Sequence, residues 1–218
     1  FHGPSLAFKD VGARFLSEVL KKIAEKEGDE ITVLVATSGD TGSAVAKSFY
    51  NIEGIRVVLL YPSGKVSQLQ EKTLTTLGGN VTAVEVQGTF DDCQKLVKQA
   101  FADREAFGDK VLTSANSINV GRLLPQMVYY FWAWRQLDGT QRNNMIFSVP
   151  SGNYGNLSAG VMAREMGLPV KRFVAASNIN RVVPDYLETG QYNPRPAVRT
   201  CSNAMDVGDP SNFARMLE

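Results

Sequence analysis

Short apolar runs alternate with helical patterns along the chain, and this alternation predicts an α/β fold. The runs, rich in β-branched and aliphatic residues, occur at residues 31–36, 56–61, 81–86, 110–113, 145–150 and 171–176. Each run is typical of a strand, and the first, at residues 31–36, fits a strand buried on both faces. Segments with helical periodicity lie around them, at residues 8–27, 43–50, 67–77, 90–107 and 183–187. Two more predicted helices have one clear bound each: one begins near residue 123, and one follows the loop at 151–156 and ends near residue 166. Strands that alternate with helices predict parallel sheets with right-handed crossovers.

The first predicted helix carries one lysine on its apolar face. At about 100° per residue, four apolar residues lie within about 40° of Lys9: Ala13, Leu16, Leu20 and Ile23. A lysine in this place can extend its amine to water from the edge of the helix. It can also lose solvation, which lowers the pKa of the amine and makes the neutral form available. The helical pattern alone leaves both interpretations open.

Two glycine-rich loops follow predicted strands. Ser38-Gly39-Asp40-Thr41-Gly42 comes after the run at 31–36, and Ser151-Gly152-Asn153-Tyr154-Gly155-Asn156 comes after the run at 145–150. A strand, a glycine turn and a helix N-terminus expose backbone N–H groups that favour an anion. Neither loop is a Walker A motif or a GxGxxG motif, so each by itself is a weak signal.

A polar segment, residues 114–122, follows the fourth predicted strand and precedes a helix. Functional groups in α/β folds collect at that end of a sheet. The segment ends at Arg122, whose planar guanidinium matches a phosphate. A neutral lysine amine forms Schiff bases with carbonyl compounds, pyridoxal phosphate among them. Two anion-binding loops and one lysine in an apolar setting therefore favour chemistry on a phosphorylated cofactor.

Composition argues against several kinds of binding partner and catalytic site. With 218 residues, 44% apolar residues and a formal net charge of +1, the chain is typical of a globular protein, with no field for nucleic acid or an anionic membrane. The one histidine, His2, argues against a Ser-His-Asp triad and against multi-histidine metal sites. Cys93 and Cys201 are far apart, which predicts no disulfide framework and a reducing, cytoplasmic setting.

We expect the chain to form two sub-domains. Residues 31–115 would make a smaller one, and residues 1–30 with 116–218 would make part of a larger one. A cleft between them would bring together Lys9, both loops and residues 114–122. The chain begins with Phe1 and ends in a helical pattern at residues 213–218, so we expect an internal piece of a longer protein.

The motifs together resemble those of threonine synthases, most closely the bacterial and fungal branch. The matching segments follow in order and in approximate spacing: residues 2–10 (HGPSLAFKD), 38–42 (SGDTG), 77–80 (LGGN), 114–119 (SANSIN), 149–156 (VPSGNYGN) and 202–208 (SNAMDVG). The resemblance covers essentially the whole chain. It implies the tryptophan-synthase β-like fold of pyridoxal-phosphate enzymes, with two parallel-sheet, three-layer sub-domains.

The resemblance also implies roles for individual residues. Lys9 would hold the cofactor as a Schiff base and move protons, and Asp40 would lie near the cofactor ring. The cofactor phosphate would be bound by the backbone N–H groups of one loop: Gly152, Asn153, Tyr154, Gly155 and Asn156. The substrate would be bound by hydroxyl, amide and guanidinium groups: Ser5, Ser38, Thr41, Asn116, Ser117 and Arg122. Ser5 stands where most members have threonine, and both keep a hydroxyl.

The implied reaction turns O-phospho-L-homoserine and water into L-threonine and phosphate, a step of threonine biosynthesis, with no metal. The nearest alternatives are a pyridoxal-phosphate dehydratase of serine or threonine and a phosphohomoserine lyase that releases a keto acid. Arg122 with Asn116 favours the phosphorylated substrate, because a dehydratase of free amino acids needs no second phosphate site. An alternative of another class is a non-catalytic phosphate- or nucleotide-binding module. The resemblance places the family's N-terminal region, and the C-terminal part with the partner of the pyridine nitrogen, outside this piece. We therefore expect the piece alone to bind the cofactor poorly or not to turn over.

Overall fold

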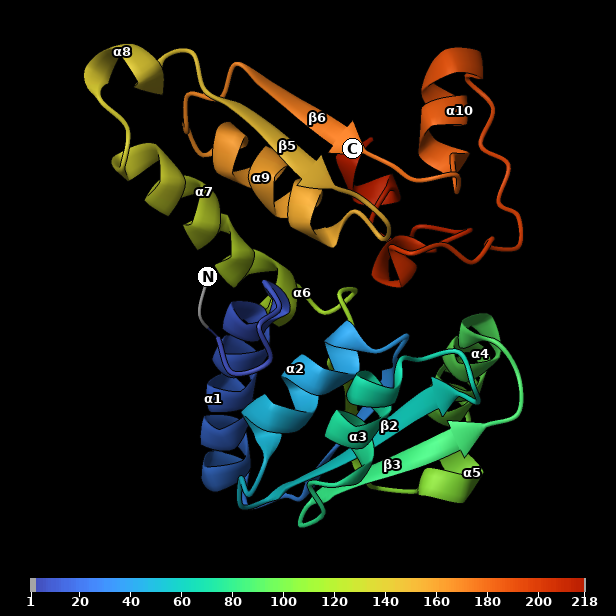
Figure 1. The fold of residues 1–218 in the computed structure, drawn as a ribbon. Helices are drawn as coiled ribbons and strands as arrows, with labels where there is room; N and C mark the ends of the chain where they lie inside the picture. The colour runs from blue at the N-terminus through green and yellow to red at the C-terminus, as the bar shows by residue number, and fades with distance from the viewer. Residues whose placement is uncertain (1–2, 218) are drawn as a thin grey trace. The chain divides into compact units, whose positions relative to one another are not determined.

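The structure, a computed structural model, describes residues 3–217, and these residues form two compact units (Figure 1). The first unit ends at Arg122 and the second begins at Leu123. The first unit therefore contains the first helix and residues 116–122 besides the predicted sub-domain at 31–115. The sub-domain boundaries at residues 31 and 115 stay a prediction.

The first unit is built on a four-stranded parallel sheet. Its elements are α1 (Lys9–Glu27), β1 (Ile31–Ala36), α2 (Asp40–Phe49), β2 (Ile55–Pro62), α3 (Gln68–Thr75), β3 (Val81–Val86), α4 (Phe90–Ala102), α5 (Arg104–Phe107), β4 (Val111–Ser114) and α6 (Val120–Leu123). The strand order is β3-β2-β1-β4, so β1 lies between β2 and β4. Ile31 of β1 is in register with Ile55 of β2 and with Val111 of β4.

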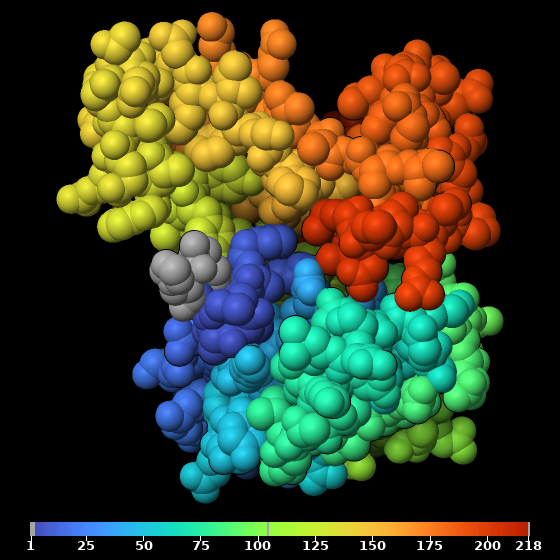
Figure 2. Space-filling model, viewed as in Figure 1, coloured from blue at the N-terminus to red at the C-terminus, as the bar shows by residue number. Residues whose placement is uncertain are grey.

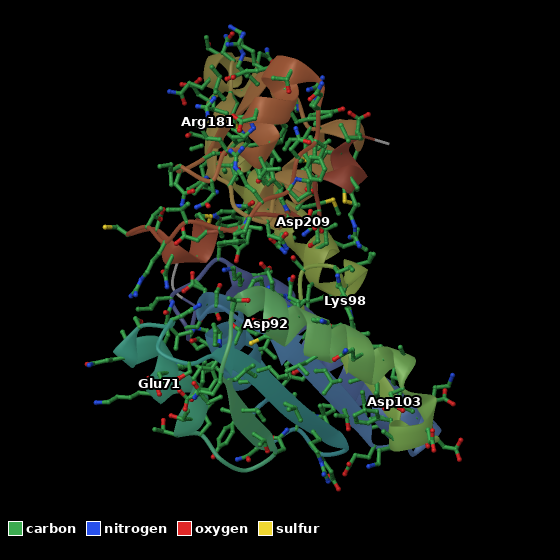
Figure 3. The ribbon with its side chains drawn as sticks, turned by 90° about the vertical axis from the view of Figure 1, so that its right-hand side faces the viewer. Glu71, Asp92, Lys98, Asp103, Arg181 and Asp209 are labelled. Carbon is green, nitrogen blue, oxygen red and sulfur yellow. The ribbon has the colours of Figure 1, made fainter. Side chains whose placement is uncertain are left out.

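Helices cover both faces of this sheet, as the buried runs predict. Alternate residues of β1 point to opposite faces. Val33 and Val35 pack in one hydrophobic cluster with residues of α1, α2 and α3. Leu34 packs in another cluster with Cys93 of α4. Figure 3 shows α4, which carries the labelled Asp92 and Lys98, in front of the strands. In the space-filling view (Figure 2), side chains close the gaps that the ribbon leaves between α1, α2 and α3.

The buried face of α1 is rotated from the predicted one. Ala13, Leu16 and Leu20 are buried as expected, but the expectation for Ile23 is wrong, because its side chain is 43% exposed. The buried set instead includes Asp10, Ser17 and Ala24. Asp10 is turned inward because its carboxylate accepts hydrogen bonds from the preceding loop, and the centre of the buried face moves with it. Lys9 consequently lies at the edge of that face.

Two predicted helices are interrupted. The segment at 90–107 divides into α4 and α5 because the Asp103 carboxylate accepts a hydrogen bond from the Ala106 N–H at 2.9 Å and starts a new turn. The helix expected from residue 123 consists of α6, a 3₁₀ turn η1 (Leu124–Gln126) and α7 (Met127–Arg135). Pro125 lies within the 3₁₀ turn, where its missing N–H costs little.

Among residues 3–217, the second unit has a smaller sheet than the first, with two strands in place of four. After η1 and α7 it contains α8 (Gly139–Arg142), β5 (Ile146–Pro150), α9 (Gly155–Glu165), β6 (Arg172–Ala176), α10 (Val182–Thr189), η2 (Asn203–Met205) and η3 (Ala214–Met216). Strands β5 and β6 form a parallel pair. Its core places Tyr130 of α7 edge-on against Phe147 and Phe173. Gly160 of α9 faces the same ring, since a Cβ there would lie 2.7 Å from Tyr130. No helix among residues 3–217 is long and apolar enough to cross a membrane.

Candidate active site

The loop before α1 is closed by the first turn of that helix. The carboxylate of Asp10, which is fully buried, accepts hydrogen bonds from the Ser5 N–H at 2.9 Å and from the Ser5 Oγ at 2.6 Å. Leu6 adopts a left-handed backbone with φ 58°, and its N–H donates to the Gly3 carbonyl at 3.0 Å. These contacts fix the chain immediately before Lys9. The hydroxyl of Ser5, predicted to bind substrate, is here a donor to Asp10.

Lys9 is the first residue of α1 and is largely buried, its side chain being 14% exposed. Its Nζ lies 3.6 Å from the Oδ2 of Asp40 and 5.5 Å from the centre of the Phe8 ring. Burial lowers the pKa of the Lys9 amine below 10.5, the Asp40 carboxylate opposes this shift, and the Arg122 charge adds to it. Of the two interpretations of the helical pattern, the buried one is confirmed.

The first glycine loop is held from within by Thr37. The buried Thr37 Oγ1 accepts hydrogen bonds from the N–H groups of Gly39 at 2.9 Å and Gly42 at 2.8 Å. Gly39 has φ 131°, a backbone that only glycine adopts readily. Ser38 lies in the loop and Thr41 in the first turn of α2, and both are partly buried. Their predicted contacts with substrate stay a prediction.

Asp40, the first residue of α2, is shared between two partners. Its Oδ2 faces Lys9, while its Oδ1 accepts a hydrogen bond from the Nε2 of Gln70 at 2.8 Å. Gln70 was missed by the sequence reasoning. The one signal for it is the capping pattern Ser67-x-x-Gln70 at the start of α3, in which Gln70 Oε1 accepts from the Ser67 N–H at 2.9 Å. That pattern indicates a helix start, but not a contact with residue 40.

Arg122 is the largest fully buried side chain among the described residues, at 1% exposure. Its guanidinium donates a short hydrogen bond to the Ala115 carbonyl. Burial lowers its pKa to about 10. Its backbone lies against α1, because a Cβ on Gly12 would lie 2.5 Å from the Arg122 carbonyl oxygen. Arg122 thus brings positive charge to Lys9, and its predicted binding of the substrate phosphate stays a prediction.

Asn116 continues the contact between β4 and β1 beyond the end of β4, at the last residue of β1. Its Nδ2 donates to the Ala36 carbonyl at 2.6 Å, and its Oδ1 accepts from the Ala36 N–H at 3.1 Å. The side-chain amide therefore takes the place of one more strand residue. The neighbouring Asn119 donates to the Ser114 carbonyl at 2.7 Å and shapes the same turn. Substrate binding by Asn116 and Ser117 stays a prediction.

The second glycine loop joins β5 to α9 in the second unit. Gly152 is pressed against the backbone of Met205, because a Cβ there would lie 2.6 Å from the Met205 Cα. Tyr154 is buried, has a left-handed backbone with φ 61° and directly precedes the helix. Gly155 and Asn156 stand in the first turn of α9, where helix geometry provides their N–H groups with no acceptor. This arrangement suits an anion at the helix N-terminus.

Side chains from later in the chain fasten this loop. The Asn153 Oδ1 accepts from the Ser211 N–H at 2.7 Å and from its Oγ at 3.0 Å. The fully buried Asn212 donates to the Asn153 carbonyl at 3.2 Å. The hydroxyls of Tyr154 and Ser177 lie 2.9 Å apart. Sequence reasoning missed these supports, since they lie more than 20 residues from the loop and form no motif with it.

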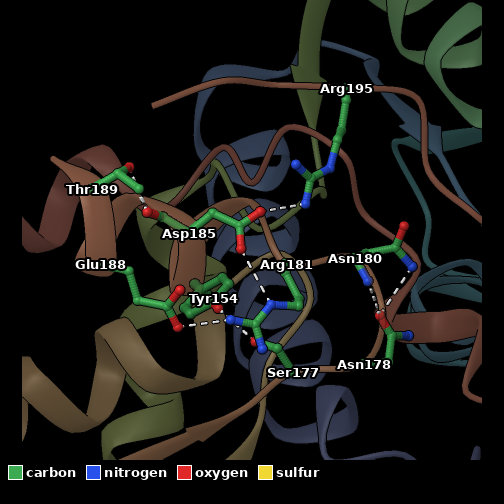
Figure 4. A network of polar contacts seen from close by, with 9 residues as sticks. All are labelled: Tyr154, Ser177, Asn178, Asn180, Arg181, Asp185, Glu188, Thr189 and Arg195. Atoms are coloured by element: carbon green, nitrogen blue, oxygen red, sulfur yellow. Dashed lines mark hydrogen bonds and ion pairs between the residues drawn. The ribbon is translucent and has the colours of Figure 1, made fainter. Parts of the chain in front are cut away.

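A polar network orders the segment that supplies Met205. The Asp206 Oδ1 accepts from the Thr200 Oγ1 at 2.6 Å and from the Asn178 Nδ2 at 2.8 Å. Figure 4 shows Asn178 and Asn180 side by side. It also shows Asp185 in contact with both Arg181 and Arg195, and Glu188 in contact with Arg181. Asp206 belongs to the motif at 202–208, so that motif holds the backbone against Gly152.

The described residues thus form two partial sites, one in each unit. In the first, the structure brings Asp40 and Arg122 within range of the charge on the Lys9 amine. In the second, Gly152 to Asn156 form one loop at a helix N-terminus. The first arrangement favours a neutral amine, and the second favours a bound anion. No group of three or more histidine, cysteine, aspartate or glutamate residues suited to a metal occurs within residues 3–217.

Comparison with known proteins gives concordant results. The family model described as "Pyridoxal-phosphate dependent enzyme" matches residues 1–217. The chain is 55% identical over 218 residues to the threonine synthase of Serratia marcescens, covering 100% of this chain and 50% of that protein. The crystal structure of threonine synthase from Escherichia coli matches with a TM-score of 0.94 and 54% identity, over 100% of this chain and 50% of that one.

A third match bears on the cofactor. The crystal structure of pyridoxal-phosphate-bound threonine synthase from Brucella melitensis gives a TM-score of 0.88 and 40% identity, over 100% of this chain and 47% of that one. The chain spans about half the length of the curated relatives it matches. The predicted parallel-sheet α/β fold, the predicted resemblance and the cofactor of the family are confirmed. The chain belongs to the family of pyridoxal-phosphate dependent enzymes.

Proposed function

We propose that this chain is part of a threonine synthase, which converts O-phospho-L-homoserine and water into L-threonine and phosphate with pyridoxal phosphate as cofactor. The observation that carries the proposal is the identity of 50–55% over the whole chain to several proteins named threonine synthase. Both cysteines are free, which suits a reducing compartment such as the cytoplasm.

The residues of both partial sites fit the cofactor chemically. Lys9 would hold the cofactor through its Nζ, since its lowered pKa increases the fraction of neutral amine that can attack a carbonyl carbon. The loop from Gly152 to Asn156 would hold the cofactor phosphate, because its close backbone packing leaves N–H groups at the start of α9. When bound, pyridoxal phosphate acts as an electron sink for carbanions.

Other residues of the chain would serve the substrate and the proton transfers. The Lys9 amine would move protons on the substrate carbons, since it is fixed at the start of a helix. Burial and the Arg122 charge lower its pKa while the Asp40 carboxylate raises it, which would keep both protonation states accessible. Arg122 and the polar residues 116–117 would favour a phosphorylated substrate over a free amino acid. Ser38 and Thr41, at the start of α2, would bind an anionic group of that substrate.

Absorbance of bound cofactor tests the role of Lys9. Full-length protein incubated with pyridoxal phosphate should develop a visible absorption band that survives dialysis and is lost in Lys9→Ala. Lys26→Ala, an exposed lysine of the same helix, is the control and should keep the band. A band that is unchanged in Lys9→Ala would refute the assignment of Lys9. No band in the wild type would favour a non-catalytic phosphate-binding module.

Product analysis separates the synthase from the dehydratase and lyase alternatives. With O-phospho-L-homoserine, a threonine synthase releases phosphate and threonine in equal amounts. Release of ammonia and a keto acid, from this substrate or from free serine or threonine, would overturn the proposed reaction while leaving the cofactor assignment intact.

A further inference from the structure

The side chain of Gln70 connects the start of α3 with the carboxylate that faces Lys9. Its Oε1 accepts from the Ser67 N–H at 2.9 Å, and its Nε2 donates to the Asp40 Oδ1 at 2.8 Å. These two contacts determine which way the amide points. In the reverse orientation, its N–H₂ would face the Ser67 N–H and its oxygen would face a carboxylate.

The glycine loop is shaped to admit this amide. A Cβ on Gly39 would lie 2.3 Å from the Gln70 Cδ and 2.4 Å from its Nε2. The amide therefore lies directly on the backbone that precedes Asp40. Only glycine leaves room for it there, and the φ of 131° at Gly39 excludes other residues independently.

Each carboxylate oxygen of Asp40 therefore has a different partner. Gln70 occupies Oδ1, and Oδ2 is 3.6 Å from the Lys9 Nζ. Asp40 is partly exposed, its side chain at 36%, so without a partner its carboxylate could turn to water. We propose that Gln70 is a positioning residue, which holds the Asp40 carboxylate in the orientation that faces the Lys9 amine.

This inference rests on the proposed role of Lys9 and adds a residue that acts on it indirectly. The charged groups that act on the Lys9 amine are Asp40 of α2 and Arg122 of α6, and Asp10 is its neighbour on α1. Asp40 is the one whose orientation depends on a neutral amide from α3. Gln70 then sets how much neutral Lys9 amine is available at a given pH.

A double-mutant cycle on the full-length, cofactor-free protein tests the proposal. The readout is the pH dependence of Lys9 acylation by an amine reagent, followed by mass spectrometry of the Lys9 peptide. In Gln70→Met the carboxylate is released, so we expect about threefold to tenfold more neutral Lys9 amine at a fixed pH below its pKa. Asp40→Asn should give the same direction. Adding Gln70→Met to Asp40→Asn should change the labelling no further, because both remove one contact.

Two further variants separate positioning from helix capping. Ser67→Ala removes the capping hydroxyl of α3 but keeps the amide of Gln70, so Lys9 labelling should match the wild type. Gln70→Asn keeps an uncharged amide, but its side chain is one methylene too short to make both contacts. The Asp40 carboxylate should again be released, so the neutral fraction of Lys9 should increase, as in Gln70→Met.

Three outcomes would overturn the proposal: wild-type labelling in Gln70→Met, an equal effect of that change in the Asp40→Asn background, or an effect of Ser67→Ala as large as that of Gln70→Met. If Gln70→Met does not fold, wild-type labelling in Gln70→Asn overturns it instead. Labelling needs no cofactor. A failure of the proposed function would therefore appear separately, as a missing absorption band in the wild-type protein.

Discussion

Lys9 carries its charge at the edge of a buried helix face, and this position has a cost. Burial lowers the pKa of its amine below 10.5, and the Asp40 carboxylate only partly restores it. In the unfolded chain the amine has its ordinary pKa, so the unfolded state binds more protons between the two values. The free energy of unfolding therefore carries the full cost of Lys9 below the folded pKa. This cost disappears as the pH rises to 10.5.

Lys9→Met should consequently be more stable than the wild type at pH 7, and the difference should shrink as the pH approaches 10.5. Urea unfolding at a series of pH values measures it. Lys26→Met, which changes an exposed lysine of the same helix, should show no such trend. A stability difference that is constant with pH would contradict the assigned cost of burying Lys9.

Several residues of the site could be predicted and others could not. The unusual setting of Lys9 is predictable because its charge breaks a helical apolar pattern, which is a local property. Gln70 was missed because its contact joins residues 30 positions apart, and sequence spacing carries no information on that approach. The hydrogen bonds between the Asn116 side chain and Ala36 were not predictable for the same reason, because the two residues are 80 positions apart. Ile23 was placed wrongly because a buried carboxylate, Asp10, rotated the helix face.

At the scale of elements, the strands were predictable and the helix ends less so. The observed bounds of β1 and β3 equal the predicted runs at 31–36 and 81–86. Strand β1 is central and almost fully buried, as its continuous apolar run indicates. Strand β3 is at the sheet edge and mostly exposed, and its polar residues Thr82 and Glu85 fit that place. Helix ends depend on side chains that compete for backbone groups, as Asp103 does between α4 and α5. The close approach of α1 to α6 was not predictable at all, since it depends on the missing Cβ of Gly12.

Gly12→Ala should destabilise the first unit by about 1–3 kcal/mol, because the new methyl would lie 2.5 Å from the Arg122 carbonyl oxygen. Backbone cannot yield as a flexible side chain can, so α1 would have to shift. Gly139→Ala is the matched control, since a Cβ there meets nothing within 4 Å. Thermal unfolding followed by circular dichroism compares the two. Equal melting temperatures would show that the two helices are not tightly packed at this point.

At the scale of the whole molecule, each unit has a hydrophobic core of its own. The chain offers one natural probe for each. Both tryptophans, Trp132 and Trp134, lie in α7 of the second unit. Cys93 lies in a core of the first unit, where burial raises the pKa of its thiol to about 11. Cys201 is exposed.

In a Cys201→Ser variant, modification of Cys93 should therefore report unfolding of the first unit alone. Tryptophan fluorescence should report the second. Because separate cores unfold as separate cooperative units, we expect the two probes to give different urea midpoints. Coincident midpoints would mean that the 218-residue chain unfolds as a single unit.

The contact of Gly152 with Met205 limits how far this chain can be shortened. The second glycine loop, with the strand before it and the helix after it, is complete by Glu165, and a designer could transplant that segment alone. That segment would lack the Met205 backbone, which packs against Gly152. It would also lack the Asn212 side chain, which donates a hydrogen bond to the Asn153 carbonyl. A peptide cut from this protein has to extend to Asn212 to keep the contacts that hold the loop in its observed conformation.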